Sequence, residues 1–146
     1  KLVTHHTDHS VLTLMSMDAI VEKDAVRVKP DMPLGRVVSV LSNSDSAFLP
    51  VLDQGGRLLG EIDLTKIRNI VFRPELYQKM RASQVMTPLP AILYRNEPMT
   101  EVMRKFDTTN ASVLPVVDIN NVLQGYITRT RLYRTYRKVV ADFSTE

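Results

Sequence analysis

Residues 48–67 read FLPVLDQGGRLLGEIDLTKI, and residues 113–132 repeat the pattern as VLPVVDINNVLQGYITRTRL. Matching positions are 65 residues apart, and the offset continues upstream without a gap, so that Pro33 pairs with Pro98. The residues common to both copies are Leu49, Pro50, Val51, Asp53, Leu58, Gly60 and Ile62 in the first, and Leu114, Pro115, Val116, Asp118, Leu123, Gly125 and Ile127 in the second. A solenoid needs about three or more units. Two copies therefore predict a pseudo-symmetric pair of units, packed face to face in one compact body.

Each copy has the pattern of a β-α-β-β-α unit. Apolar runs of strand length alternate with segments of helical periodicity, and polar or Gly-rich turns separate them. The expected helix N-caps are Asp31, Asp63, Ser83 and Thr128. The predicted elements are strands at 26–28, 47–52, 57–62, 91–93, 112–117 and 122–127, and helices at 33–41, 64–72, 98–106 and from 128 onward. The sequence therefore predicts an α/β (α+β) fold.

The domain organisation follows from the repeat. We expect a linker with a short helix at 1–17, a first unit at 18–74, a connector at 75–81, a second unit at 82–136 and a helical extension at 137–146. The hairpin turns carry Gly55-Gly56 in one copy and Asn120-Asn121 in the other, and both residue types tolerate the left-handed conformation. The chain begins without Met and in mid-pattern, which we interpret as a piece of a longer protein.

The composition is that of a soluble globular protein, with 44% apolar and 24% charged residues among 146. The absence of cysteine excludes disulfides and thiol catalysis. No apolar run approaches the ~20 residues of a membrane span. The net charge is +3, and the basic cluster on the final helix lacks a stacking platform for nucleic acid, so we expect a solvated face. No catalytic set and no metal triad is recognisable, so neither an enzyme nor a metal site is expected.

Three short stretches carry a family resemblance: VMTP at 85–88, LPVVD at 114–118 and GYIT at 125–128. Within a tandem β-α-β-β-α repeat, they resemble a pair of CBS (cystathionine β-synthase type) domains, which together form a Bateman module. The resemblance covers residues 18–136. It implies a homodimer formed through the CBS helical faces, and adenine nucleotides (ATP, ADP or AMP) as ligands in clefts between the units.

The flanking stretches resemble a narrower group. VLT at 11–13, the connector IRNIVFRPELY at 67–77 and the ending at 136–144 are similar to the cytosolic tail of bacterial chloride channel (ClC) family proteins. This resemblance implies a regulatory and dimerisation module on the cytoplasmic face of the bacterial inner membrane, joined to the membrane-embedded part of a chloride channel or chloride/proton antiporter. The alternative is a soluble nucleotide-sensing module of a metabolic enzyme.

The nucleotide signature of the CBS family is Gly, two apolar residues, Ser or Thr, two variable residues and Asp, where the Asp accepts the ribose hydroxyls. The first copy has Asp63 at the hydroxyl position and Lys66 at the Asp position. The second copy keeps Thr128 but has Arg131 at the Asp position. Lys and Arg have no acceptor for a hydroxyl proton. A cation near a helix N-terminus can instead contact a phosphate.

The resemblance implies that the second copy holds the better site, formed by Thr128, Arg131, Thr87, Pro90 and Ala91. The corresponding residues of the first copy are Asp63, Lys66, Glu22, Ala25 and Val26. There, the negative charge of Asp63 opposes a phosphate. A simpler interpretation makes Asp63 and Thr128 helix caps only, with Lys66 and Arg131 as solvated charges. The missing ribose acceptor favours this simpler interpretation.

Overall fold

The computed structural model describes residues 10–46 and 48–144 and has the expected mixed α/β fold, with helices and two sheets. The expected linker at 1–9 and the last two residues of the helical extension lie outside the described residues. The chain divides into two compact units. Within the described residues, unit 1 contains 10–23, 90–117 and 124–144, and unit 2 contains 24–89 and 118–123.

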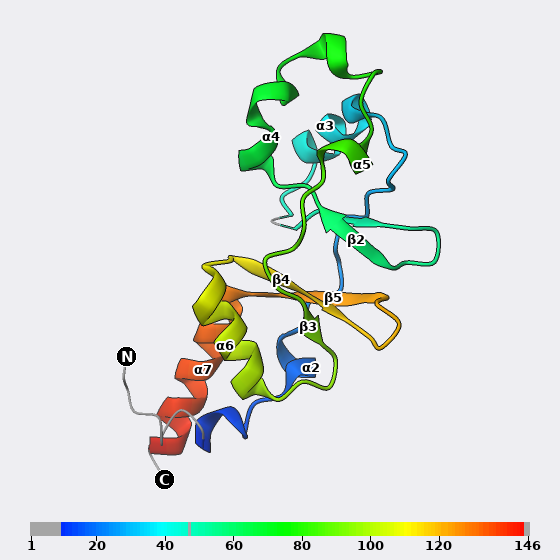
Figure 1. Cartoon of the computed structure of the whole chain (residues 1–146). Coiled ribbons are helices and arrows are strands. Elements are labelled where there is room, and N and C mark those ends of the chain that lie inside the picture. The colour runs from blue at the N-terminus through cyan, green and yellow to red at the C-terminus, as the bar shows by residue number, and fades with distance from the viewer. Residues whose placement is uncertain (1–9, 47, 145–146) are drawn as a thin grey trace. The chain divides into compact units, whose positions relative to one another are not determined.

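Unit 2 contains most of the first repeat (Figure 1). Its elements are α3 (Leu34–Ser42), β1 (Pro50–Leu52), β2 (Leu58–Glu61), α4 (Leu64–Val71), the 3-10 helix η1 (Pro74–Leu76) and α5 (Ala82–Val85). Strands β1 and β2 pair antiparallel, and Val28 adds one parallel bridge to Val51. Alternating burial in β2 and the apolar faces of α3 and α4 enclose one hydrophobic core.

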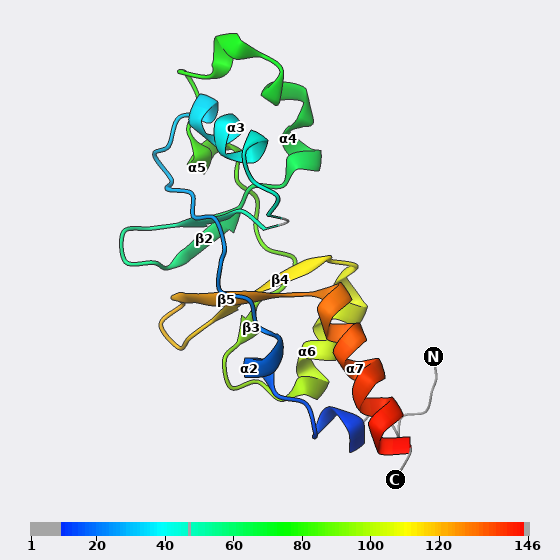
Figure 2. The same ribbon diagram turned by 180° about the vertical axis from the view of Figure 1, so that it is seen from behind.

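Unit 1 contains most of the second repeat (Figure 2). Its elements are α2 (Met17–Ile20), β3 (Leu93–Tyr94), α6 (Met99–Thr109), β4 (Val113–Val117), nearly all of β5 (Leu123–Thr128) and α7 (Arg129–Ser144). The three strands form a sheet in the order β3-β4-β5, with β3 parallel to β4. Arg129 Nη2 of α7 donates a hydrogen bond to the carbonyl of Phe106 in α6. This contact ties the two long helices together.

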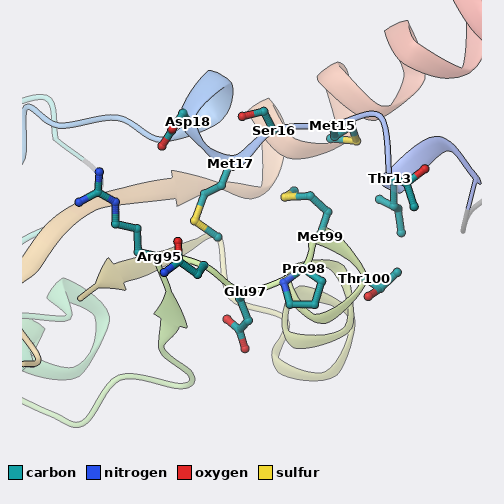
Figure 3. A pocket seen from close by; sticks show the side chains of 12 residues that line it. Thr13, Met15, Ser16, Met17, Asp18, Arg95, Glu97, Pro98, Met99 and Thr100 are labelled. Carbon is teal, nitrogen blue, oxygen red and sulfur yellow. The ribbon is translucent and has the colours of Figure 1, made fainter. Parts of the chain in front are cut away.

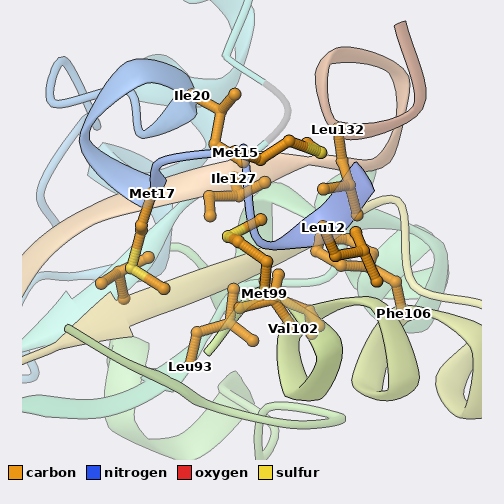
Figure 4. Close-up of a cluster of buried hydrophobic side chains, with 12 residues drawn as sticks. Leu12, Met15, Met17, Ile20, Leu93, Met99, Val102, Phe106, Ile127 and Leu132 are labelled. Atoms are coloured by element: carbon orange, nitrogen blue, oxygen red, sulfur yellow. The ribbon is translucent and has the colours of Figure 1, made fainter. Parts of the chain in front are cut away.

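The short helix that opens each repeat packs into the core of the other repeat. Helix α2 opens the first repeat, yet Met17 and Ile20 are buried with Phe106 and Leu132 in unit 1 (Figure 4). Helix α5 opens the second repeat, yet its buried residues belong to the core of unit 2. The apolar stretch at 11–17 also packs on unit 1, as expected for this stretch. The two repeats thus exchange their leading segments.

Backbone bridges fix this exchange at equivalent positions. Glu22 and Tyr126 exchange two N–H···O bonds of 2.8 Å in unit 1, and Glu61 and Thr87 exchange two of 2.9 Å in unit 2. A Cβ atom at Gly125 would lie 2.4 Å from the carbonyl oxygen of Glu22. The repeated glycine is therefore required by the close approach of the exchanged segment.

The other repeated polar residue, Asp53 or Asp118, orders the hairpin turn. In both copies its Oδ1 accepts the N–H groups two and four residues further along, at 2.9 and 2.9 Å for Asp53 and 2.8 and 3.0 Å for Asp118. Gly56 and Asn121 occupy the same turn position with φ of +85° and +66°. The left-handed conformation expected of the Gly-rich and Asn-rich turns is therefore confirmed.

Several predicted boundaries were wrong. The strand expected at 26–28 is a single bridge at Val28, because the chain before it meets no neighbouring strand among the described residues. Asp31 does not cap α3, since Pro33 occupies the N-cap position without a side-chain bond. Ser83 lies inside α5, where the Arg81 N–H donates to Gln84 Oε1 instead. Strand β3 covers Leu93–Tyr94 instead of 91–93, and residue 47 of the first long strand is outside the described residues.

Candidate functional site

The candidate site of each unit lies where the last strand of the hairpin is followed, at once or after two residues, by a helix. In unit 1, Thr128 Oγ1 accepts the N–H of Arg131 at 3.1 Å at the start of α7. In unit 2, Asp63 Oδ1 accepts the N–H of Thr65 at 3.0 Å and the hydroxyl of Thr65 at 2.7 Å at the start of α4. Both residues therefore serve as the helix caps that the sequence predicts.

In unit 1 the Arg131 guanidinium lies beside a carboxylate. Arg131 Nη1 is 3.9 Å from Glu22 Oε2, and Arg131 Nη2 donates to the carbonyl of Ala19 at 3.3 Å. The hydroxyl of the buried Tyr126 lies 3.5 Å from Glu22 Oε1. The side chains of Arg131 and Glu22 are 43% and 29% exposed. A cation, an acceptor and a hydroxyl thus lie together, and the first two remain open to solvent.

In unit 2 the equivalent positions carry different chemistry. The pKa of Glu61 is raised to about 7, mainly by burial and also by the negative charge of Asp63, while the charge of Lys66 acts in the opposite direction. The hydroxyl of Thr87 is buried and has no hydrogen-bond partner among the described residues. Lys66 itself is exposed. This site is therefore rich in carboxylates and has one unused hydroxyl.

The site residues are grouped differently from the prediction, in which Thr87 belongs with Arg131 and Glu22 with Lys66. The structure places Thr87 beside Glu61 in unit 2, and Glu22 beside Arg131 in unit 1. The exchange of leading segments is the physical reason. A 65-residue repeat shows which positions are equivalent, but not which copy a leading segment packs against.

The remaining predicted residues lie on either side of the unit boundaries. Ala25 and Val26 are half-buried in unit 2. Pro90 is exposed in unit 1, while Ala91 packs against the core of that unit. Tyr126 and Glu61, which follow the repeated glycines, were not identified as site residues. Their equivalence in the 65-residue offset is the signal that could have found them.

A separate cavity of about 610 Å³ opens in unit 1 between residues 12–18 and 95–100 (Figure 3). Buried Met15, Met17 and Met99 line its apolar side, and Arg95 and Asp18 are among its polar lining residues. Its volume is in the range of small-molecule sites. None of the site residues predicted from the sequence lines this cavity.

Among the described residues, no helix is both long and apolar enough to cross a membrane. Curated relatives cover most of the chain. Inosine-5'-monophosphate dehydrogenase of Methanocaldococcus jannaschii is 27% identical over 120 residues, which are 82% of this chain and 23% of that protein. Homoserine O-acetyltransferase of Methanococcus vannielii is 21% identical over 119 residues, 82% of this chain and 24% of that protein. The chain spans about a quarter of the length of these two relatives.

Solved structures share the fold. CbpB in complex with c-di-AMP is 16% identical with a TM-score of 0.78, and the match covers 96% of both chains. CbpB from Streptococcus agalactiae is 17% identical with a TM-score of 0.76, covering 100% of this chain and 94% of that one. CBSX2 in complex with AMP is 22% identical with a TM-score of 0.65, covering 88% and 96%.

The two repeats also match a family model in sequence. The CBS domain model matches residues 17–73 and again residues 82–138, which together are more than half of the chain. Both matches contain the repeated Gly, the turn Asp and the strand-to-helix junction described above. The chain therefore belongs to the CBS domain family and carries two CBS domains.

Proposed function

We propose that this chain is a regulatory CBS pair that senses an adenine nucleotide through the site of unit 1. The observation that carries the proposal is the position of Arg131. Its guanidinium is half-exposed, one turn into the 16-residue helix α7, next to the capping Thr128. A cation at the start of a long helix suits a phosphate, because the helix end and the side chain attract the same charge. The role is regulatory and not catalytic.

The structural relatives support this choice of ligand. CbpB has been solved with c-di-AMP and CBSX2 with AMP, and both share the fold of this chain. ATP, ADP and AMP, which the sequence resemblance implies, contain the same adenosine phosphate group as these ligands. The ligand class we propose is therefore an adenosine phosphate, and the titration below separates its members.

Unit 2 is the weaker candidate for a phosphate. Glu61 and Asp63 face the same junction, and the charge of Asp63 raises the pKa of Glu61. A phosphate placed there would meet one full negative charge and a second carboxylate that is ionised above about pH 7. Lys66 offers one exposed cation against these two groups.

A thermal-melt titration with AMP, ADP, ATP and c-di-AMP tests the proposal. A ligand at 100 times its dissociation constant should stabilise the folded chain by about 2.7 kcal/mol. Arg131→Ala should abolish the rise in Tm. Arg137→Ala, an exposed arginine six residues further along α7, should leave it intact. Lys66→Ala should also leave it intact, because it changes only unit 2.

Unchanged melts with all four nucleotides at millimolar concentration would reject nucleotide sensing. A rise that Lys66→Ala abolishes and Arg131→Ala does not would move the site to unit 2. Either result is distinct from a general loss of folding, which the nucleotide-free melt of each variant reports.

We also propose that the module forms a homodimer through its helices. In unit 2, Leu64 is 50% exposed and Phe72 is 80% exposed, beside a cavity of about 290 Å³ lined also by Val38, Leu41 and Tyr77. Exposed apolar patches of this kind mark interaction surfaces. Sedimentation should therefore give a dimer for the wild type, and Phe72→Ser should shift it toward monomer. A wild-type monomer at high micromolar concentration would contradict the proposal.

Two parent proteins remain proposals. The flanking stretches support the cytoplasmic tail of a chloride channel or antiporter at the bacterial inner membrane, and the two curated relatives, both enzymes, support a regulatory module of a metabolic enzyme. Membrane fractionation of the protein expressed from its own gene separates the two. Recovery in the membrane fraction after a high-salt wash supports the channel, whereas recovery in the supernatant supports the enzyme.

A further inference from the structure

Position 131 carries a cation, but a nucleotide site also needs a hydrogen-bond acceptor for the sugar hydroxyls. A ribonucleotide presents an anionic phosphate and, a few ångströms away, two neighbouring hydroxyl donors. Arg131 can serve the phosphate, but it has no atom that accepts a hydroxyl proton. Thr128 Oγ1 already accepts the N–H of Arg131. The acceptor has to come from elsewhere in the unit.

The exchanged leading segment brings a carboxylate to this place. Glu22 Oε2 lies 3.9 Å from the Arg131 guanidinium. Two backbone bonds of 2.8 Å to Tyr126 hold the Glu22 main chain against β5, and the missing Cβ of Gly125 allows that approach. The carboxylate is thus placed by rigid backbone contacts.

The Glu22 carboxylate has unused acceptor capacity. Its ion pair with Arg131 is 3.9 Å long, and its contact with the Tyr126 hydroxyl is 3.5 Å long. Both exceed the usual length of a charge-assisted hydrogen bond. A carboxylate accepts about four hydrogen bonds, and this one is 29% exposed. Two hydroxyl donors can therefore bind to it while Arg131 faces an anion.

We propose that Glu22 accepts the ribose hydroxyls of the nucleotide in unit 1, and that the site therefore selects ribonucleotides over nucleotides without these hydroxyls. The inference rests on the proposed function and assigns the sugar half of the same site. Glu22, which comes from the first repeat, thus supplies the acceptor that is missing at position 131 of the second repeat. In unit 2 the equivalent positions are Thr87 and Lys66, where no carboxylate stands in the place of Glu22.

Calorimetric titration with AMP and with 2′,3′-dideoxy-AMP tests the proposal. Wild type should bind AMP about tenfold more tightly than the dideoxy analogue, as expected for hydrogen bonds to a charged acceptor at a partly exposed site. Glu22→Ala should reduce that ratio to about twofold or less. Arg131→Ala should weaken both ligands while the ratio persists. Arg137→Ala, at an exposed position further along α7, should leave affinity and ratio unaltered.

Glu22→Gln provides the second variant if Glu22→Ala melts at a lower temperature without ligand. It keeps the size of the side chain and the backbone bridge, and should still lower the ratio about threefold because the acceptor loses its charge. Equal binding of both ligands by wild type, or a ratio that survives both Glu22 variants, would overturn the proposal. Failure of AMP, ADP, ATP and c-di-AMP to bind at all would instead refute the nucleotide function itself, and this inference with it.

Discussion

At the residue scale, the repeated positions have different physical roles. Asp53 and Asp118 order turns through their Oδ1 atoms, and the core residues fill the interior. Gly60 and Gly125 have to be glycine, because the backbone of the exchanged segment occupies the space that a Cβ atom would need. A repeated residue therefore reports a repeated contact, and the contact does not have to lie within its own copy.

The two glycines should differ in their tolerance of a methyl group. At Gly125 a Cβ would lie 2.4 Å from a backbone oxygen, and at Gly60 it would lie 2.9 Å from one. Gly125→Ala should cost about 3 kcal/mol and Gly60→Ala about 1 to 2 kcal/mol. Gly55→Ala, where the nearest atom is the tip of the flexible Arg57 side chain, should be nearly neutral. Urea unfolding measures all three, and equal costs at 125 and 55 would contradict the exchange.

Glu61 should make stability fall as the pH rises. Its pKa is raised from 4.5 to about 7 in the folded chain, so the folded state binds more protons between these values and loses stability through that window. Glu61→Gln should remove the decline and raise Tm at pH 8 by about 3 °C, an increase limited by solvent screening of this half-buried group. The control Glu75→Gln, at an exposed position, should give no such rise. A wild-type Tm that is constant from pH 5 to 8 would contradict this account.

At the element scale, local signals determined most of the fold. The 3.6-residue periodicity placed α3, α4, α6 and α7, and the turn residues placed both hairpins. The caps Asp63 and Thr128 were predicted because hydroxyl and carboxylate side chains compete for the free N–H groups at a helix start. Asp31 and Ser83 were wrong as predicted caps because the actual N-cap of each helix, Pro33 or Arg81, lies two residues away.

What local signals could not provide was the partner of each leading helix. α2 and α5 occupy equivalent positions in the repeat, and each has four residues with two of them buried. Nothing in four residues distinguishes the core of one unit from that of the other. The choice is made by long-range bridges at Glu22 and Thr87, so the cluster of Glu22 with Arg131 could not be predicted.

The capping hydrogen bond of Asp63 and its negative charge have effects that can be measured separately. Asp63→Ala should cost about 1 kcal/mol of unfolding free energy, whereas Asp63→Asn should cost almost nothing because an amide oxygen caps equally well. Asp63→Asn should also lower the pKa of Glu61, since the charge of Asp63 contributes to its rise. Chemical denaturation measures the first effect, and NMR titration of the Glu61 carboxyl measures the second. Equal losses in both variants would show that the charge, and not the cap, stabilises α4.

At the scale of the whole molecule, the exchange makes each unit depend on both repeats. Unit 1 takes Leu12, Met15, Met17 and Ile20 from the segment at the start of the first repeat. Removing these side chains would expose Phe106 and Leu132, which are buried in the same core. A single CBS repeat excised at its own sequence boundaries would therefore lack part of its interior.

A chain that begins at residue 24 should consequently lose unit 1 selectively. Hydrogen exchange should show unprotected amides in α6 and α7, while α3 and α4 in unit 2 remain protected. Addition of a peptide of residues 10–23 should restore protection in α7. Protected α6 and α7 amides without the peptide would show that the leading segment is dispensable. A matched chain with Ser16→Ala, at an exposed position in the same segment, should behave as wild type.

The exchanged segment also sets the order of events on the ribosome. Leu12 and Ile20 emerge before the rest of unit 1, but the helix that helps to bury them ends at Ser144. At about 5 to 20 residues per second, the apolar side of the leading segment stays exposed for roughly 6 to 25 seconds before its partner is complete. Nascent unit 2 can close earlier, apart from the turn at 118–123 that it takes from the second repeat. A ribosome-associated chaperone would thus find a binding site in the leading segment, and would release it only after α7 has left the ribosome.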